Sequence, residues 1–281
     1  MELITLWLIN GSIILILMSL TWVISLARKD SSIADIVWGL GFVIVFWATY
    51  ALTSPSWTPR LALLAGTITL WGGRLSLHLL LRNAGRGEDP RYAAWREQAG
   101  PAWWWRSLFK VFLLQGSLMW IIALPLIATP LANLSSPLRC LDYAALGLWA
   151  IGFIFEAGGD WQLARFKKDP ANRGRILTAG LWSITRHPNY FGDAAQWWAF
   201  WLIAASAGAT WTIISPLLMT FLLVRVSGVA MLERTLASRP EYRKYMARTS
   251  AFLPWFPKRA QPTPVERLAT YPAPTPQSKE T

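Results

Sequence analysis

Residues 180–193, which read GLWSITRHPNYFGD, hold the densest set of side chains that can ionise, hydrogen-bond or carry a proton. Eight consecutive positions contain Arg186, His187, Asn189, Tyr190 and Asp193. Pro188 removes a backbone donor and biases the residue before it toward an extended conformation. A simple connection between two apolar helices needs only a few polar residues, so this density indicates a binding or catalytic segment. The alternative, a cationic anchor with a helix cap, accounts for only part of the set.

Other ionisable residues interrupt the long apolar runs of the chain. Each costs about 2.5–3.5 kcal/mol at the centre of a membrane helix and usually faces an interior cavity or a partner. Residues four apart share a helix face, which pairs Arg74 with His78 and Glu156 with Asp160. The remaining members are Asp35, Asp193 and Arg225, with Glu233 two turns after the last of these. This pattern fits either interhelical ion pairs or a site for a charged ligand, and its convergence toward the basic loops favours the ligand.

The helices that carry these residues are predicted to span a membrane. The chain has 281 residues, of which 54% are hydrophobic and 19 are tryptophan. Its apolar runs of about 20 residues follow one another, which is typical of a polytopic membrane protein rather than a soluble domain. One cysteine and two histidines make a metal site or an intrachain disulfide a poor expectation.

Seven spans are predicted, and the fold class is therefore all-α. They cover residues 5–26, 33–52, 61–81, 108–129, 141–163, 194–208 and 211–232. Of the loop and tail cations, 22 fall on one side and only Arg60 and Arg139 on the other. Because cytoplasmic loops collect Lys and Arg, we expect the N-terminus outside and the C-terminus in the cytoplasm. Residues 1–256 form one membrane domain in this interpretation, and the Pro-rich residues 257–281 form a flexible tail.

The excess of cations in the loops on one side indicates an anionic ligand. The net charge is +12, and Arg forks suit phosphate groups. The sequence has no GxGxxG after a strand and no GxxxxGK[ST], so a phosphorylated cofactor would lie among membrane helices and their loops. Apolar walls beneath such a site would accept a lipid-soluble substrate.

Several segments carry a family resemblance. They are ADIVWGLGF at 34–42, WGGRLSLHLLLRNAGRGEDPRY at 71–92, FLLQG at 112–116, EAGGDWQLARFKKD at 156–169, the RHPNYFG segment, and FLPWFPK at 252–258. Together these segments resemble the steroid 5-alpha-reductase superfamily, in particular its bacterial membrane members. The RHPNYxG core alone is shared with isoprenylcysteine carboxyl methyltransferases and sterol reductases.

The resemblance implies a seven-helix fold that holds NADPH and reduces the C=C bond of a 3-oxo-Δ4 steroid or a similar enone lipid. It implies that Asn189 and Asp193 contact the nicotinamide carboxamide and ribose, and that Asp160 lies on the adenosine side. The remaining predicted cofactor contacts are Lys167 and Arg175 near the phosphates, then Arg74, Arg86 and Arg225, and finally His78, His187, Tyr190, Glu156 and Glu233. Glu156 and Glu233 stand where animal members have Asn and Tyr.

Two residues are predicted to be catalytic. Asp35 aligns with the glutamate that polarises the substrate ketone, and Trp71 takes the place of its tyrosine partner, with one N–H to donate. Asp35 can polarise a ketone only when protonated or through water. The alternative is that Asp35 caps the second helix, since it follows SSIA near a helix start.

Two other functions stay open at this point. One is an S-adenosylmethionine-dependent methyltransferase of the isoprenylcysteine type, and the other is a non-catalytic lipid-binding or transport protein. For the reductase, we expect membrane lipids and a lipophilic enone as partners, no nucleic acid, a monomer, and a bacterial inner membrane with the cofactor mouth facing the cytoplasm.

Overall fold

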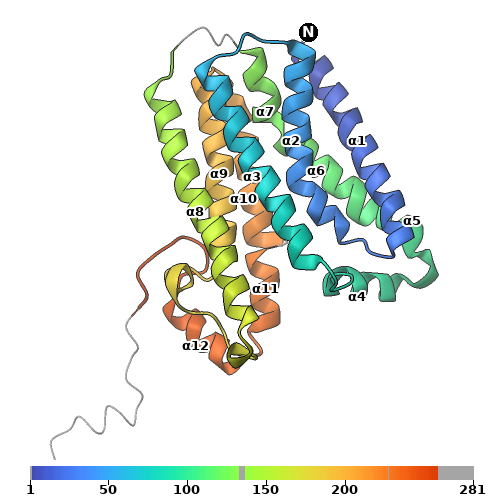
Figure 1. Ribbon diagram of the computed structural model, residues 1–281, viewed down its shortest axis with the longest axis vertical. Coiled ribbons are helices and arrows are strands. Elements are labelled where there is room, and N and C mark those ends of the chain that lie inside the picture. The colour runs from blue at the N-terminus through green and yellow to red at the C-terminus, as the bar shows by residue number, and fades with distance from the viewer. Residues whose placement is uncertain (1, 133–136, 227, 259–281) are drawn as a thin grey trace, which may run out of the picture.

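The computed structural model describes residues 2–132, 137–226 and 228–258, and all the regular structure within these ranges is helical. The predicted tail therefore lies almost entirely outside the described residues. The long helices run side by side along the molecule, and α4 and α12 lie at the end opposite the N-terminus (Figure 1). In chain order the helices are α1 (Leu3–Arg28), α2 (Ile33–Thr53), α3 (Pro59–Asn83), α4 (Pro90–Ala99), α5 (Trp103–Ser107), α6 (Leu114–Ile122), α7 (Leu124–Ala128), α8 (Cys140–Lys168), α9 (Pro188–Ser206), α10 (Ile214–Phe221), α11 (Val229–Leu236) and α12 (Pro240–Arg248).

Many large apolar side chains point outward from these helices. On α1 alone, Ile4, Leu8, Leu15, Ile16 and Leu20 are each more than half exposed. A soluble protein rarely tolerates such a surface, whereas lipid tails cover it without cost. Together with the length of the apolar helices, this surface identifies an integral membrane protein.

Among the described residues, four helices are long and apolar enough to cross a membrane. They are α1, α2, α8 and the Thr210–Leu236 stretch. The stretch Pro90–Ile122 with Leu124–Leu131 raises the number to five, although it bends by 48° at Ala123. Pro125 follows the bend in the first turn of α7, where a missing N–H allows a helix to kink. Helices α3 and α9 are not apolar enough to count as spans, because both carry polar and charged side chains. Seven spans and their orientation therefore stay predictions.

Two short segments interrupt the regular α-helical hydrogen bonding without changing the order or direction of the helices. Residues Leu108–Leu113 and Leu222–Val226 are π-helical, and the first joins α5 to α6.

Helix α9 begins at Pro188, six residues before the predicted sixth span. Asn189 and Asp193 are therefore helical residues on successive turns rather than parts of a loop.

Glycine pairs allow close contact between helix backbones. A Cβ on Gly152 of α8 would lie 2.7 Å from the Gly192 carbonyl oxygen, and a Cβ on Gly192 would meet the Gly152 oxygen and the Glu156 nitrogen. Likewise, a Cβ on Gly39 of α2 would lie 2.6 Å from the carbonyl oxygen of Gly72 in α3. These contacts fix the position of Glu156 against α9 and set the register between α2 and α3.

Replacing Gly192 with alanine is expected to destabilise the protein by about 1–3 kcal/mol, because α8 and α9 must move apart and both contribute backbone atoms at the contact. The matched control is Gly147→Ala, also on α8, where an added Cβ has no atom within 4 Å. That control should be neutral or slightly stabilising, because alanine favours a helix. Thermal unfolding of the detergent-solubilised variants measures both effects, and equal melting temperatures for the two would contradict this packing.

Candidate functional site

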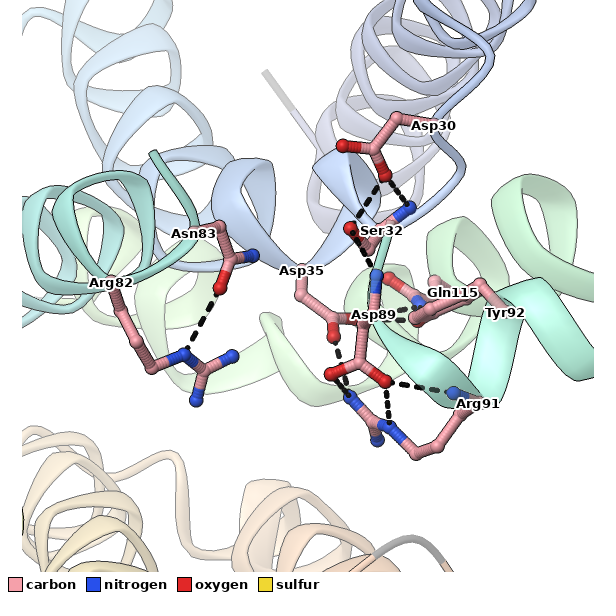
Figure 2. Close-up of polar contacts among 9 residues, drawn as sticks. All are labelled: Asp30, Ser32, Asp35, Arg82, Asn83, Asp89, Arg91, Tyr92 and Gln115. Atoms are coloured by element: carbon pink, nitrogen blue, oxygen red, sulfur yellow. Dashed lines mark hydrogen bonds and ion pairs between the residues drawn. The ribbon is translucent and has the colours of Figure 1, made fainter. Parts of the chain in front are cut away.

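Asp35 lies in the first turn of α2 at the centre of a hydrogen-bonded cluster (Figure 2). The Tyr92 hydroxyl donates to Asp35 Oδ1 at 2.6 Å, and Gln115 Nε2 approaches the same oxygen at 3.3 Å. Gln115 Nε2 also donates to the Tyr92 oxygen at 3.0 Å. The Asp35 side chain keeps 23% of its surface exposed, so a ligand can reach this cluster.

Arg91 bridges two carboxylates in the same cluster. Its guanidinium lies 3.0 Å from Asp35 Oδ2 and 2.9 Å from Asp89 Oδ1. A neighbouring guanidinium favours the ionised form of a carboxyl group. Asp35 accepts hydrogen bonds in this cluster, and Tyr92 supplies its hydroxyl donor.

A second ion pair holds the loops around Asp35 in place. Arg96 binds both oxygens of Glu88 at 2.8 Å, and the backbone N–H of Ser31 donates to Glu88 at 2.7 Å. Burial by itself raises the pKa of the Glu88 carboxyl, but the hydrogen bonds from Arg96 and Ser31 outweigh it and leave that pKa below its usual value. This bridge ties the connection between α1 and α2 to the start of α4.

A separate polar cluster joins α3, α8 and α9. Arg74 forms ion pairs with Glu156 and, at 2.7 Å, with Asp160. His78 Nε2 lies 3.6 Å from Asp160, and Asn189 Nδ2 donates to Asp160 at 3.1 Å. The two predicted residue pairs at a spacing of four thus face each other across the helix interface.

Several buried polar atoms of this second cluster have no hydrogen-bond partner among the described residues. They include Arg74 Nε, Asp193 Oδ1 and Gln196 Oε1. Buried polar groups are normally hydrogen-bonded, so unpaired ones indicate bound water or a ligand. The cluster is suited to holding a polar molecule between the three helices.

The segment that precedes α9 is clamped by the C-terminal helices. The Arg186 guanidinium pairs with Glu233 of α11 at 2.6 Å and donates to the carbonyls of Met246 and Thr249. The backbone N–H of Arg186 donates to the Ser250 carbonyl at 2.9 Å. Arg186 therefore orders the segment. These contacts explain the arginine at this position better than a membrane-anchoring role would.

His187 lies beside the same carboxylate, with its Nε2 3.3 Å from Glu233 Oε1 and its ring stacked on Tyr190. Burial lowers the pKa of the imidazole to about 4, although Glu233 opposes this shift. In the folded protein His187 is therefore neutral at physiological pH, while in the unfolded chain it takes up a proton near its ordinary pKa of 6.5.

A pH-dependent loss of stability follows from this difference in pKa. Above pH 6.5 the neutral His187 makes its full contribution to the free energy of unfolding. This contribution is lost as the pH falls toward 4, because the unfolded state then binds a proton that the folded state does not. Relative to His187→Gln, the wild type should lose about 3 kcal/mol over this interval. Thermal unfolding of both proteins across the interval measures the effect, and parallel pH profiles would contradict it.

The other predicted cationic contacts are exposed and form no ion pair among the described residues. Arg86 and Lys167 belong to this set, and the nearby Arg82 donates to Asn83. Arg82 and Arg86 lie close enough to Lys167 for their positive charges to act on its ammonium group. Arg175 and Arg225 are also exposed, on the loop after α8 and in the π-helical segment after α10. Uncompensated positive charge is therefore present where α3 and α8 end.

The structure differs from the sequence interpretation in the partner of Asp35. Trp71 is fully buried and packs against Phe42, Trp197 and Phe200, and its indole N–H has no hydrogen-bond partner among the described residues. The register explains this, because Gly39 faces Gly72 across antiparallel helices, so Trp71 lies more than a turn beyond the level of Asp35. Tyr92, Arg91 and Gln115 take that place instead. All three stand in the quoted segments 71–92 and 112–116, but sequence spacing could not bring them to Asp35.

The fold is that of a helical membrane protein, with two polar clusters between its helices that are suited to binding a ligand. The family described as "Protein of unknown function (DUF1295)" matches residues 21–249. The chain belongs to this family, which is the steroid 5-alpha-reductase-like membrane family.

Three individual relatives are similar to this chain over different lengths. "Uncharacterized protein C594.04c" of Schizosaccharomyces pombe is 27% identical over 268 residues, which cover 85% of this chain and 77% of the yeast protein. "Delta(14)-sterol reductase erg24" of the same yeast is 34% identical over 79 residues, 24% of this chain and 18% of that protein. "Probable O-methyltransferase ustE" of Ustilaginoidea virens is 40% identical over 68 residues, 24% of this chain and 23% of that protein. No solved structure matches the chain.

Proposed function

We propose that this protein is an NADPH-dependent membrane reductase that saturates the carbon–carbon double bond of an enone lipid of the 3-oxo-Δ4 steroid type. The observation that carries the proposal is the Asp35–Tyr92–Gln115 cluster, set at the same end of the bundle as the uncompensated cations. Family membership and the partial similarity to a sterol reductase support it.

Enone reduction needs a hydrogen-bond donor at the ketone oxygen, where negative charge develops. Tyr92 is the neutral donor with the hydroxyl available for this role. Asp35, paired with Arg91, accepts from that hydroxyl in the resting protein and orients it, while Gln115 donates to the Tyr92 oxygen. In this proposal the Tyr92 hydroxyl turns from Asp35 to donate its one proton to the ketone oxygen, and Asp35 positions Tyr92 before the substrate binds.

The residues of the α3–α8–α9 cluster suit a dinucleotide. Unpaired buried atoms on Arg74, Asp193 and Gln196 would meet its polar groups, and the cations around Lys167 would meet its phosphates. Two or more such cations favour NADPH over NADH, since the 2′-phosphate adds negative charge. When bound, the nicotinamide would supply hydride, and the protein would position and polarise the substrate.

The site should open toward the cytoplasm. The ends of α3 and α8 and the whole of α12, all of which carry cations, lie at the end of the bundle away from the N-terminus (Figure 1). Positive loops stay on the cytoplasmic side, and a soluble cofactor is available there. The lipophilic substrate would enter from the surrounding lipid, in the inner membrane if the source is bacterial.

Purified protein with NADPH and a 3-oxo-Δ4 steroid should oxidise the cofactor and yield the saturated ketone. Ligand-induced thermal stabilisation provides a second readout, because only a true ligand raises the melting temperature. NADPH should stabilise the wild type, and Asn189→Ala should lose most of that effect. Stabilisation by S-adenosylmethionine instead would identify a methyltransferase, and no turnover across a panel of enone lipids would overturn the reductase.

A further inference from the structure

Three carboxyl groups surround a single guanidinium in the interior of the α3–α8–α9 cluster. Glu156 and Asp160 come from α8, Asp193 comes from α9, and Arg74 comes from α3. Glu156 and Asp160 act electrostatically on Asp193 from one side, and Arg74 is the cation that faces it. Three ionised carboxylates with one cation would leave excess negative charge in a low-dielectric interior, which is strongly unfavourable.

The hydrogen-bond donors around these carboxyl groups are shared unequally. Glu156 forms an ion pair with Arg74 and accepts a hydrogen bond from the Gln196 amide at 2.5 Å. Asp160 forms an ion pair with Arg74 at 2.7 Å and accepts a hydrogen bond from Asn189 at 3.1 Å. His78 Nε2 lies 3.6 Å from the same carboxylate. Both groups therefore have the donors that an ionised carboxylate needs.

Asp193 has no comparable set of donors. Its Oδ1 is buried and accepts no hydrogen bond from any described residue. The neutral Trp197 indole lies near the carboxyl but does not bond to Oδ1. Gln196, which is fully buried and three residues further along α9, has an unpaired acceptor in Oε1. Of the three carboxyl groups, Asp193 alone has a buried oxygen without a donor among the described residues.

From this distribution of donors we propose that Asp193 is a neutral carboxylic acid that holds a proton in the resting protein. The proton compensates the excess negative charge of the cluster. Glu156 and Asp160 share Arg74. The α3–α8–α9 cluster is thus a site for one transferable proton.

The use of this proton rests on the proposed function. In enone reduction the double bond takes hydride at its β-carbon from the reduced dinucleotide, and the electron pair of the double bond moves to form an enolate. The enolate α-carbon then forms a C–H bond with the Asp193 proton, while the O–H bond breaks and leaves a carboxylate beside Arg74. His78, whose side chain is 25% exposed, lies at the accessible edge of the cluster through which solvent restores the proton.

Infrared spectroscopy tests for the proton without any ligand. The detergent-solubilised protein at neutral pH should show the C=O stretch of a protonated carboxylic acid. Labelling aspartate with ¹³C at the side-chain carboxyl should shift the band, which assigns it to Asp rather than Glu. The absence of a shifted band in the labelled wild type overturns the proposal even if no variant folds.

Two variants locate the proton. Asp193→Asn should remove the band, whereas the matched control Asp160→Asn, at an ionised position of the same cluster, should leave it. Persistence of the band in Asp193→Asn overturns the assignment. Asp193→Asn should also lose turnover even at saturating NADPH, and wild-type turnover would exclude Asp193 as the proton source. If the wild type binds no dinucleotide, the proposed function fails while the infrared result still decides the protonation state.

Discussion

Replacing Tyr92 with phenylalanine is expected to lower kcat/KM for the enone substrate by roughly 10²–10³-fold, the usual effect of removing one donor from a developing oxyanion. The side chain is buried in the α4 region beside Asp35 and Gln115, and the substitution keeps the ring that packs against Trp95. The fold and the NADPH site should therefore survive, because the α3–α8–α9 cluster does not include Tyr92. Steady-state kinetics together with the NADPH-induced thermal shift separate the two effects.

The matched control is Tyr143→Phe, since this tyrosine on α8 is 63% exposed and contacts neither cluster. It should behave as the wild type in both measurements. Near-wild-type kcat/KM for Tyr92→Phe would remove Tyr92 from the chemistry. A loss of NADPH stabilisation in the same variant would show instead that the two clusters are structurally coupled.

A buried ion pair at the other end of the bundle should produce the largest effect on stability. Arg60 at the start of α3 pairs with Asp142 through Nε to Oδ1 and Nη2 to Oδ2, both at 2.9 Å. Both residues are 1% exposed, and Asp142 also accepts from the Ser206 hydroxyl and the Arg139 backbone N–H. This network joins the ends of α3, α8 and α9.

Asp142→Ala is expected to reduce the free energy of unfolding by about 3–5 kcal/mol, because it leaves the Arg60 guanidinium buried without its carboxylate. The informative comparison is the double variant Arg60→Met with Asp142→Leu. Replacing both charges with apolar groups of similar size is often neutral, so the double variant should recover most of the loss. Thermal unfolding in detergent measures both, and a single variant as stable as the double one would contradict a desolvated pair.

Arg60 and Arg139 illustrate how a charge count and a structure complement each other. The count placed these two cations alone on the side opposite the other loop cations, and the structure shows both at the Asp142 network. The asymmetry could be read from the sequence because loop charge depends only on composition. The pairing could not, because Arg60 and Asp142 are 82 positions apart.

The sequence by itself determined the class of protein, the helical fold and most residues of the polar clusters. Apolar runs and ionisable residues spaced four apart are local properties, so the face shared by Glu156 and Asp160, and that shared by Arg74 and His78, could be predicted. The extent of α9 back to Pro188 could also have been suspected, since proline is favoured in the first turn of a helix.

Only the tertiary structure decided which side chains meet. It paired Asp35 with Tyr92 and Gln115 rather than with Trp71, and it left Asp193 without donors while it satisfied Glu156 and Asp160. The physical reason is that a contact between helices depends on their register and rotation, which close glycine contacts such as Gly39–Gly72 and Gly152–Gly192 set. A shift of one helical turn would exchange every polar partner without altering the hydrophobic pattern of any single helix.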